Sequence, residues 1–317
     1  PERGHLRTGM CGVGGQSHSP TGGAYGSYMF GIGATEMLGV CVTGQIWVQV
    51  PRTLRLQWAG RLQPGVSAKD MMLHTIARLG MNGGQYQAVE FAGSAVQALS
   101  MPERMTLSNM SAELGAQAGL IAADDTTRDW LQAVGVPAEQ LEGAEQWFTD
   151  EDAAFEPHRF DASALSPQVA APHSPANTRD VAEFADVKPG FAYIGACTGA
   201  KLEDMRAAAS VLRGQRVAAG VQLLVAPASA REQAQAEKEG VMRVLRDAGA
   251  TVLPNSCGAC AGYGGTFPEG ATVISSTARN FKGRMGPASV NVYLASPYTV
   301  AASALRGHIS DAREILA

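Results

Sequence analysis

Three cysteines lie in two sequence contexts that could together bind a metal cluster. Cys197 lies in Gly195-Ala-Cys-Thr-Gly199, whereas Cys257 and Cys260 form a Cys-x-x-Cys pair. Three thiolates can bind three irons of a four-iron cluster and leave the fourth iron without a cysteine ligand. An iron with an open position is a Lewis acid, so the pattern favours chemistry on a substrate over electron transfer.

A Cys-x-x-Cys pair alone is also typical of a structural zinc site, of a redox pair or of two small buried residues. The third cysteine, at the end of another predicted strand, weakens these alternatives. A zinc site would need a fourth ligand, and no further His or Cys stands close to either motif. Cys11 and Cys41 stand alone, and we interpret them as small core residues because free cysteine is often buried.

A second pattern is a turn rich in Ser and Thr that carries two arginines. It runs from Ser275 to Arg284 as Ser-Ser-Thr-Ala-Arg-Asn-Phe-Lys-Gly-Arg. Guanidinium groups bind carboxylates through two parallel hydrogen bonds. We therefore regard Ser276, Arg279 and Arg284 as candidates for binding a substrate with several carboxylates. A solvated basic turn is the alternative interpretation.

Two further segments carry polar groups that could transfer protons. Asn109 and Glu113 are four residues apart and would share one face of a helix, although a helix cap or a surface pair explains such spacing equally. The Gly-rich loop contains Gln16-Ser-His-Ser19, in which Ser17 and His18 are candidates and His18 could exchange protons. Most loop histidines have no catalytic role, and the other five have no context that distinguishes them.

The segments that must position the cysteines alternate between strands and helices. The predicted strands are Phe191–Gly195, Val221–Ala226, Thr251–Leu253 and Ala271–Ser275, and the predicted helices are Lys201–Arg213 and Ala230–Ala248. This alternation predicts a parallel sheet covered by helices. Ligands of such sheets bind beyond the carboxyl ends of the strands. All three cysteines and the segment after Ser276 follow strand ends, so we expect them to converge.

The first half of the chain is less regular. We expect a Gly-rich loop at residues 9–35, strands at 46–50 and 53–58, and a linker at 155–174. The predicted helices are 68–80, which has Ser67 as its N-cap, a second from 102 or 108 to 118, and a third at 126–134.

The bulk composition excludes several classes of protein. The chain has 317 residues, 45% of them hydrophobic and 17% charged, which fits a globular protein of at least two domains and not a disordered one. Its net charge of −4 gives no basic field for nucleic acid or anionic lipid. No apolar run is long enough to span a bilayer and no signal peptide is visible. Five cysteines without disulfide-framework spacing favour a reducing compartment, so we expect a cytoplasmic protein.

Taken in order, these motifs closely resemble the aconitase superfamily over almost the whole chain. The nearest resemblance is to the large subunits of 3-isopropylmalate dehydratases and to homoaconitase-like proteins. The segments that carry it are Phe30-Gly-Ile-Gly-Ala-Thr-Glu36, Pro64-Gly-Val-Ser-Ala-Lys-Asp70, Glu90-Phe-Ala-Gly93, Asn109-Met-Ser-Ala-Glu113, Gly119-Leu-Ile-Ala-Ala-Asp124, Cys197-Thr198, Leu202-Glu-Asp-Met-Arg206, Cys257-Gly-Ala-Cys260 and Arg279-Asn-Phe-Lys-Gly-Arg284.

The resemblance implies a fold of aconitase-like three-layer α/β domains around a central iron–sulfur cleft. We expect residues 1–52 to complete a first α/β domain whose start is missing. Residues 53–175 would form a second domain that ends in the Pro/Ala-rich linker, and residues 176–317 a third that carries the cluster cysteines. Because the chain begins at Pro1 and not at Met, we expect an N-terminal segment to be lacking.

The resemblance also implies a cofactor. It assigns Cys197, Cys257 and Cys260 to a [4Fe–4S] cluster that has one iron free for the hydroxyl and carboxylate of the substrate. The same resemblance assigns Arg279 and Arg284 to the substrate carboxylates.

Roles for the polar residues of the first half follow from the same resemblance. It places Asn109 and Glu113 beside the cluster, with Glu113 contacting the iron-bound water or hydroxyl. Ser17 and His18 match the Ser-His of the family motif Gly-Asp-Ser-His-Thr. Removal of hydroxide from a 2-hydroxy acid needs an electrophile, a proton donor and a base for the carbon-bound proton. In the family the base is a serine of a separate swivel domain, so we expect this chain alone to bind a cluster and half a substrate but not to turn over.

The chain departs from the family pattern at several positions. Gln16 stands where the family has Asp, and Gly199-Ala200-Lys201 stands where it has Asn-x-Arg. The family's N-terminal segment and its swivel domain have no counterpart here. In two-subunit members the swivel domain is a separate small protein, so we expect such a partner for this chain.

The sequence therefore predicts the large subunit of a hydro-lyase or isomerase that dehydrates and rehydrates a substituted malate-type acid. Its substrate would be a di- or tricarboxylic acid, with neither nucleic acid nor membrane as a partner. One alternative is a specialised paralogue that acts on citraconate, maleate or a secondary-metabolite intermediate. A second alternative is a non-catalytic iron–sulfur sensor or assembly subunit.

Overall fold

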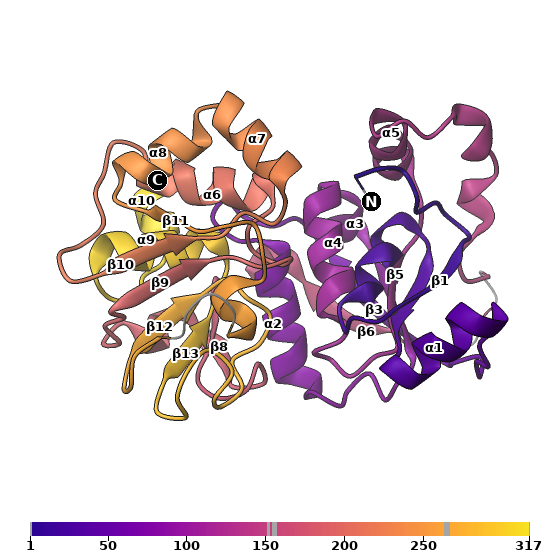
Figure 1. Ribbon diagram of the computed structural model, residues 1–317, viewed down its shortest axis with the longest axis horizontal. Coiled ribbons are helices and arrows are strands. Elements are labelled where there is room, and N and C mark those ends of the chain that lie inside the picture. Colours follow the sequence, from indigo (N-terminus) through magenta and orange to yellow (C-terminus); the bar gives the residue numbers. More distant parts are fainter. Residues whose placement is uncertain (1, 151–152, 154–156, 263–266, 317) are drawn as a thin grey trace. The chain divides into compact units, whose positions relative to one another are not determined.

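The computed structural model describes residues 2–150, 153, 157–262 and 267–316 (Figure 1). Contacts along the chain divide it into two compact units. Unit 1 comprises Pro1–Arg61 and Leu79–Ser163, and unit 2 comprises Leu62–Arg78 and Ala164–Ala317. The division into three consecutive domains expected from the sequence stays a prediction. Both units are mixed α/β structures with parallel strands, which confirms the predicted fold class.

Unit 1 is built on a four-stranded parallel sheet with the strand order β5-β4-β3-β6. Its strands are β3 (Thr53–Ala59), β4 (Ala88–Ala92), β5 (Ala118–Ile121) and β6 (His158–Asp161). Trp58 stacks on Phe160 with ring centroids 4.5 Å apart, which fixes β6 against β3. The helices of unit 1 are α1 (Ala34–Thr43), α3 (Ser94–Gln97), α4 (Met101–Met110) and α5 (Asp125–Ala133).

A small second sheet of unit 1 carries the Gly-rich segment. Strands β1 (Cys11–Gly14) and β2 (Tyr28–Gly31) pair in parallel, and the 3₁₀ helix η1 (Ser19–Tyr25) connects them. Helix η1 packs on α4 and β5. The approach is so close that a Cβ atom on Gly23 would lie 1.7 Å from the carbonyl oxygen of Gly119. Only glycine at position 23 therefore allows η1 to reach the sheet.

Unit 2 contains the regular α/β pattern expected from the sequence. Its seven-stranded sheet has the order β11-β10-β9-β12-β13-β7-β8, in which β9 to β13 are parallel and β7 and β8 form an antiparallel edge. The strands are β7 (Gln168–Ala170), β8 (Thr178–Asp180), β9 (Phe191–Ile194), β10 (Gln222–Val225), β11 (Thr251–Val252), β12 (Thr272–Ser275) and β13 (Asn291–Leu294).

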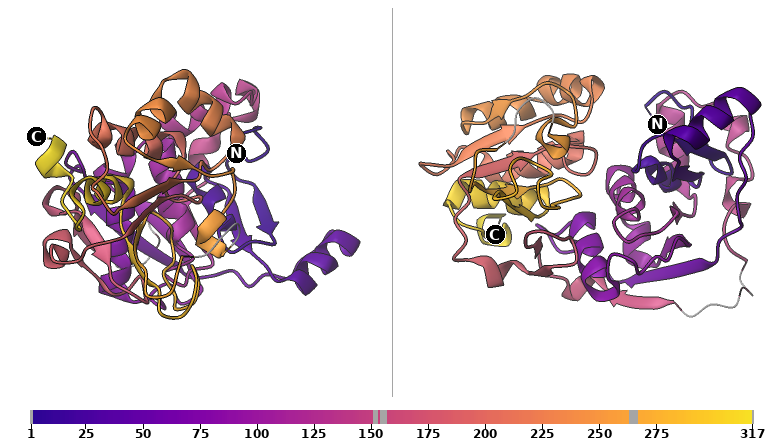
Figure 2. Two further views of the ribbon diagram at one scale, coloured as in Figure 1. Left: turned by 60° about the vertical axis from the view of Figure 1, so that its left-hand side comes forward. Right: turned by 60° about the horizontal axis from the view of Figure 1, so that its bottom comes forward.

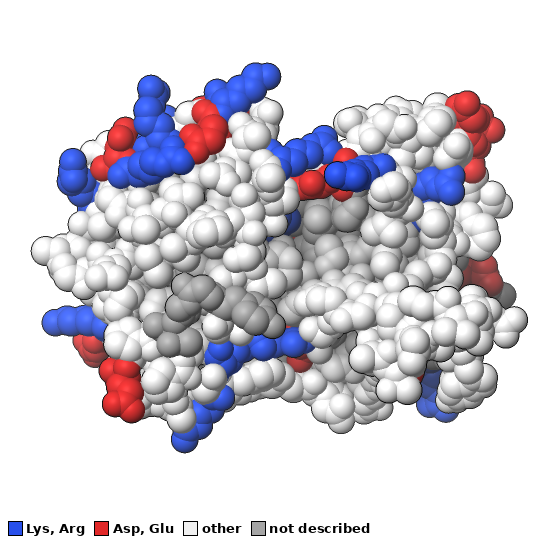
Figure 3. Space-filling model, in the orientation of Figure 1, with Lys and Arg blue, Asp and Glu red and all other residues white. Residues whose placement is uncertain are grey.

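Five helices of unit 2 contribute to an apolar core against this sheet. They are α6 (Leu202–Leu212), α7 (Ala230–Lys238), α8 (Val241–Asp247), α9 (Pro297–Arg306) and α10 (Arg313–Leu316). Unit 2 also contains α2 (Ala68–Leu79). On the face shown in Figure 3, basic and acidic side chains lie side by side. Unit 2 contains the ion pairs Arg206–Glu239 and Arg246–Glu237. Among the helices that the structure describes, none has the length and apolar character needed to cross a lipid bilayer.

Several predicted elements are wrong. Residues 46–50 form no strand, because this extended segment has no paired neighbour and leaves Trp47 84% exposed. Helix α4 ends at Met110 and not at 118, since the chain turns through Gly115 at a positive φ of 81° to enter β5. The predicted helix Ala230–Ala248 is two helices, which Gly240 separates at a positive φ of 76°.

Two segments expected to be irregular contain secondary structure. The predicted loop at residues 9–35 holds β1, η1 and β2, and the predicted linker at 155–174 holds β6 and β7. Residues 155 and 156 of that linker lie outside the described residues. Cys11 and Cys41 are exposed, so their assignment to the core is wrong. Cys41 lies on α1, which buries none of its residues and stands away from the rest of unit 1 (Figure 2).

Candidate active site

The three cysteines of unit 2 follow the carboxyl ends of parallel strands, as predicted. Cys197 lies just after β9, and Cys257 and Cys260 follow β11 around the 3₁₀ turn η6 (Gly258–Ala261). Because these strands are parallel, their carboxyl ends share one edge of the sheet. None of the chain's five cysteines, all of which lie in the described ranges, is joined in a disulfide.

The three thiols and one arginine act on one another electrostatically. Burial raises the pKa of Cys260, which is 5% exposed, and negative charge on Cys197 and Cys257 raises it further. The guanidinium of Arg284 opposes this, because its Nη2 lies 3.7 Å from Cys260 Sγ. Cys260 therefore lies near enough to Cys197 and Cys257 for their charges to act on it, and it contacts Arg284, one of the two predicted substrate arginines.

The donor set is of the chemical type that iron–sulfur clusters use. Across the described parts of the chain, no three His, Cys, Asp or Glu side chains are grouped closely enough to hold one metal ion. In a four-iron cluster each thiolate binds a different iron, so its cysteines surround the cluster and do not converge on a point. The three cysteines are free thiols, and one of them, Cys260, lies beside Arg284.

A buried lysine that sequence reasoning missed supports the loop of Cys197. The Nζ of Lys69, on α2, donates to the carbonyl oxygens of Ser276 at 2.6 Å and Thr277 at 2.7 Å, and lies 3.4 Å from the Thr198 hydroxyl. Lys69 is 1% exposed. The sequence did contain a signal, since Lys69 falls on the same helix face as Met72 and therefore occupies a core position.

Ser276, predicted to bind substrate, is completely buried and supports the same loop. Its Oγ accepts a hydrogen bond from the backbone N–H of Gly195 at 3.0 Å and donates to the carbonyl of Gly199 at 3.1 Å. The Ser276 hydroxyl therefore holds both sides of the Cys197 turn. Arg279, further along the same segment, is partly buried.

Unit 1 brings His18 and Glu113 into direct contact. His18 Nε2 lies 3.0 Å from Glu113 Oε1, and the two residues are 7% and 1% exposed. His18 is the residue before η1, and Glu113 lies in the turn after α4, so the packing of η1 on α4 produces the pair. A buried imidazole and carboxylate at this distance can exchange or share a proton.

Asn109 reaches the same region of unit 1 through a hydroxyl. Its Nδ2 donates to Thr21 Oγ1 at 2.8 Å, and Thr21 Oγ1 donates to the carbonyl of His18 at 2.6 Å. Asn109 lies on α4, whereas Glu113 follows the end of that helix, so they do not share a helix face as predicted. They converge because both face η1. Ser17, beside His18, is exposed.

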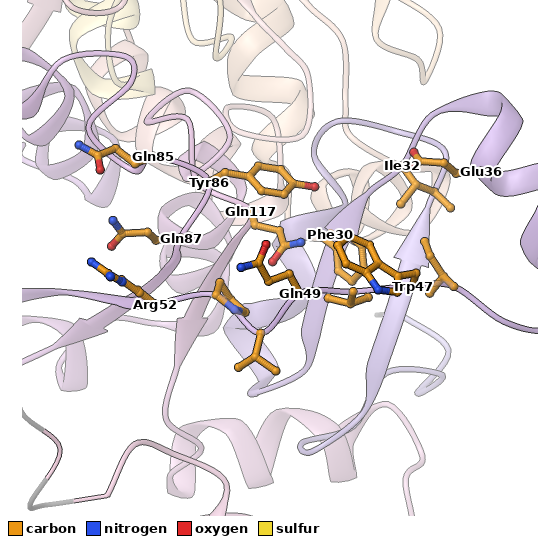
Figure 4. A pocket seen from close by; sticks show the side chains of 14 residues that line it. Phe30, Ile32, Glu36, Trp47, Gln49, Arg52, Gln85, Tyr86, Gln87 and Gln117 are labelled. Carbon is orange, nitrogen blue, oxygen red and sulfur yellow. The ribbon is translucent and has the colours of Figure 1, made fainter.

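One pocket of unit 1 contains none of these residues. It has a volume of about 590 Å³, and its lining includes the apolar Phe30 and Trp47, the amides of Gln49 and Gln117, and the charged Glu36 and Arg52 (Figure 4).

Comparison with known proteins shows the family of the chain. The profile of the family described as "Aconitase family (aconitate hydratase)" matches residues 1–191 and 178–307. The chain belongs to the aconitase family. It is 41% identical over 319 residues to the 3-isopropylmalate dehydratase large subunit 1 of Methanopyrus kandleri. This alignment covers 100% of this chain and 75% of that protein.

Two other members of the aconitase family are similarly close. The 3-isopropylmalate dehydratase large subunit of Halothermothrix orenii is 40% identical, and large subunit 1 of Pyrococcus furiosus is 39% identical. Each comparison covers 100% of this chain and 74% of the relative. Membership in the aconitase family implies a [4Fe–4S] cluster.

One departure from the aconitase family pattern has a direct steric reason. Where the family motif has Asn, this chain has Gly199, and a Cβ atom there would lie 2.2 Å from Ser276 Oγ. Lys201, in place of the family's Arg, forms an ion pair with Asp204 at 2.7 Å and lies 3.5 Å from the carbonyl of Cys197. Ser276 and Lys201 therefore both contact the turn of Cys197 and support it.

Proposed function

We propose that this chain is the cluster-bearing large subunit of a hydro-lyase that dehydrates and rehydrates a substituted malate-type acid. The observation that carries the proposal is the set of three cysteines with Arg284 at the carboxyl edge of the unit 2 sheet. The names of the relatives, all 3-isopropylmalate dehydratase large subunits, support the same reaction class.

Cys197, Cys257 and Cys260 would hold the cluster, one iron each, and leave one iron without a cysteine. When bound, such a cluster supplies a Lewis acid for the hydroxyl and carboxylate of the substrate. The chain's own contribution is to fix the thiolates. Lys69 and Ser276 hold the Cys197 turn, and Arg284 stabilises negative charge on the sulfur of Cys260.

The remaining candidates bind the substrate or move protons. We assign Arg279 and Arg284 to substrate carboxylates, because guanidinium groups match them with paired hydrogen bonds. Glu113 and His18 would exchange the proton that accompanies loss and return of the hydroxyl group. Asn109 orients this pair through Thr21, and the exposed Ser17 is available to substrate.

Ser276 can bind substrate only if the Cys197 turn moves and releases its hydroxyl group. Its hydroxyl is bound on both sides by backbone of that turn in this structure. We therefore propose that its first role is to shape the cysteine loop.

The partners follow from the same assignment. We propose a separate small subunit that supplies a swivel domain, and a di- or tricarboxylic acid as substrate. The large-subunit names of the relatives support the first partner, and the arginines support the second.

A specialised paralogue acting on another acid, such as citraconate, maleate or a secondary-metabolite intermediate, is the second candidate function. Gly199 and Lys201 favour it, because they remove an amide and a guanidinium from the cluster side of the family pattern. A non-catalytic iron–sulfur sensor or assembly subunit would need no buried His18–Glu113 pair.

The deciding experiment measures iron and acid-labile sulfide in protein purified without oxygen, followed by EPR after mild oxidation. We expect a three-iron signal that disappears when ferrous iron and reductant are added. Assays with a small subunit and a panel of 2-hydroxy acids then separate the two enzymatic candidates. Zinc, or no metal under anaerobic handling, would contradict the proposal, and a cluster without activity on any acid would favour the sensor.

A further inference from the structure

Gln16 contacts His18 at two points, although it precedes it by only two residues. Gln16 Oε1 accepts a hydrogen bond from the backbone N–H of His18 at 2.7 Å. Gln16 Nε2 lies 3.3 Å from Nδ1 of the His18 ring. The other ring nitrogen, Nε2, lies 3.0 Å from Glu113 Oε1. The imidazole is therefore held between an amide and a carboxylate.

The backbone N–H determines which way the Gln16 amide faces. A backbone N–H can only donate, so the Gln16 atom that meets it must be the carbonyl oxygen. The amide NH₂ group then faces His18 Nδ1. Because an NH₂ group can also only donate, Nδ1 must be the acceptor. A neutral imidazole that accepts at Nδ1 carries its proton on Nε2.

We propose that Gln16 is a positioning residue that holds His18 as the neutral Nε2–H tautomer, which donates to the Glu113 carboxylate. In this arrangement Glu113 keeps its negative charge and the pair carries one proton, on His18 Nε2. The catalytic meaning of this assignment rests on the proposed function, because it leaves Glu113 as the proton acceptor of the pair. The tautomer itself follows from the hydrogen bonds of unit 1 alone.

The departure from the family motif gives Gln16 its consequence. A carboxylate at position 16, such as the Asp of that motif, can only accept hydrogen bonds. It would accept from both the backbone N–H and a protonated Nδ1 of His18. His18 Nε2 would then either be an acceptor, which requires a protonated Glu113, or belong to an imidazolium. The residue at position 16 therefore decides which member of the His18–Glu113 pair holds the proton.

The Gln16 amide also opposes the imidazolium form of His18. A proton on Nδ1 would point at the Gln16 NH₂ group, which has no lone pair to accept it. Rotating the Gln16 amide by half a turn would place its NH₂ group against the backbone N–H of His18, so that two donors would face each other. Protonation of Nδ1 therefore loses one hydrogen bond in either orientation.

The test is a two-bond ¹H–¹⁵N correlation spectrum of the full chain with ¹⁵N-labelled histidine rings, recorded at neutral pH. The chain has six histidines, and a His18→Asn variant identifies the signals of His18. We expect Nε2 to be protonated and Nδ1 unprotonated in the unsubstituted chain. In Gln16→Glu, which is isosteric with glutamine, we expect the proton to appear on Nδ1.

The matched control is Gln215→Glu, which makes the same change at an exposed turn after α6 and should leave the His18 signals in place. A protonated Nδ1 or a mixture of tautomers in the unsubstituted chain would overturn the proposal. A Gln16→Glu spectrum identical to that of the unsubstituted chain would also overturn the proposal. The unsubstituted spectrum decides the question even if Gln16→Glu does not fold. Failure of hydro-lyase assays would contradict the proposed function and leave this spectrum unaffected.

Discussion

The ammonium group of Lys69 lies 2.6 Å from the carbonyl oxygen of Ser276, and both residues are buried. Ser276 in turn holds the turn of Cys197 through its hydroxyl. A helix side chain thus supports a cysteine loop that lies more than a hundred residues away in the sequence. Because buried carbonyl oxygens are costly to leave without donors, this support should have a measurable energy.

Replacing Lys69 with Met keeps the length of the side chain but removes the donor to Ser276 and Thr277. We expect the free energy of unfolding to fall by about 2–4 kcal/mol, because two buried carbonyls lose a charged donor. Urea unfolding measures this change. Lys238→Met, at an exposed site, is the control and should stay within about 0.5 kcal/mol. Equal stabilities of the two variants would show that the buried ammonium adds nothing.

Gly199→Ala tests the steric fit between the Cys197 turn and Ser276. The added methyl group would lie 2.2 Å from Ser276 Oγ and 2.4 Å from its carbonyl oxygen. We expect a loss of about 1–3 kcal/mol, typical of overpacking, and a lower iron content after reconstitution.

A matched substitution of another glycine should raise the stability of the fold and not lower it. Gly39, within α1, has no atom within 4 Å of the position of an added Cβ. Gly39→Ala should therefore raise stability by about 0.5–1 kcal/mol through helix propensity. Thermal unfolding of both variants compares them. A Gly199→Ala variant that is as stable as Gly39→Ala would contradict the close contact seen here.

Asp124 and Arg104 form an ion pair that should make unit 1 sensitive to acid. Burial alone would raise the pKa of Asp124, but the hydrogen bonds and charge of Arg104 lower it below its ordinary value. A carboxyl with a lowered folded pKa stabilises the fold above its unfolded pKa. This stabilisation is lost as the pH falls through the folded pKa. Stability measured by urea unfolding should therefore decline below about pH 4.

Asp124→Asn should remove this acid-dependent part of the stability. Since Arg104 is fully buried and Asp124 partly exposed, we expect a loss of about 2–4 kcal/mol at neutral pH. The neighbouring Asp125→Asn removes an exposed pair with Arg128 and should change stability by less than about 0.5 kcal/mol. Unchanged acid dependence in Asp124→Asn would assign the decline to other carboxyls.

Glu113→Gln should separate proton transfer from cluster binding. The amide keeps the size of the side chain but cannot accept a proton from His18 or substrate. We expect kcat to fall by about 10²- to 10⁴-fold in the enzyme reconstituted with its small subunit, with iron and sulfide content unchanged. Glu139→Gln, at an exposed site, is the control. A kcat equal to that of the control would exclude Glu113 from the chemistry.

The regular part of the fold could be predicted because its signals are local. Unit 2 alternates short apolar strands with amphipathic helices, and each candidate cysteine directly follows a strand, so sheet topology alone brought the thiols to one edge. Strand Thr53–Ala59 and helix α2 were predicted from alternation and capping in the same way.

The parts that failed depend on contacts between distant segments. The apolar residues 46–50 look like a strand, but no neighbouring strand pairs with them. Asn109 and Glu113 were grouped because their spacing fits a helix, but helix α4 ends at Met110. The two residues converge only because η1 packs on α4. The contacts of Lys69 span 207 residues, so its position on the apolar face of α2 was visible in the sequence but its partner was not.

The chain enters unit 2 twice, since Leu62–Arg78 belongs with residues that begin only at Ala164. Neither unit can therefore be encoded by one uninterrupted stretch of gene. A single recombination crossover near residue 163 would inherit the Cys197 turn from one parent and the lysine beneath it from another. Chimaeras between relatives should for this reason retain their clusters only when the short α2 segment and the C-terminal half come from the same parent.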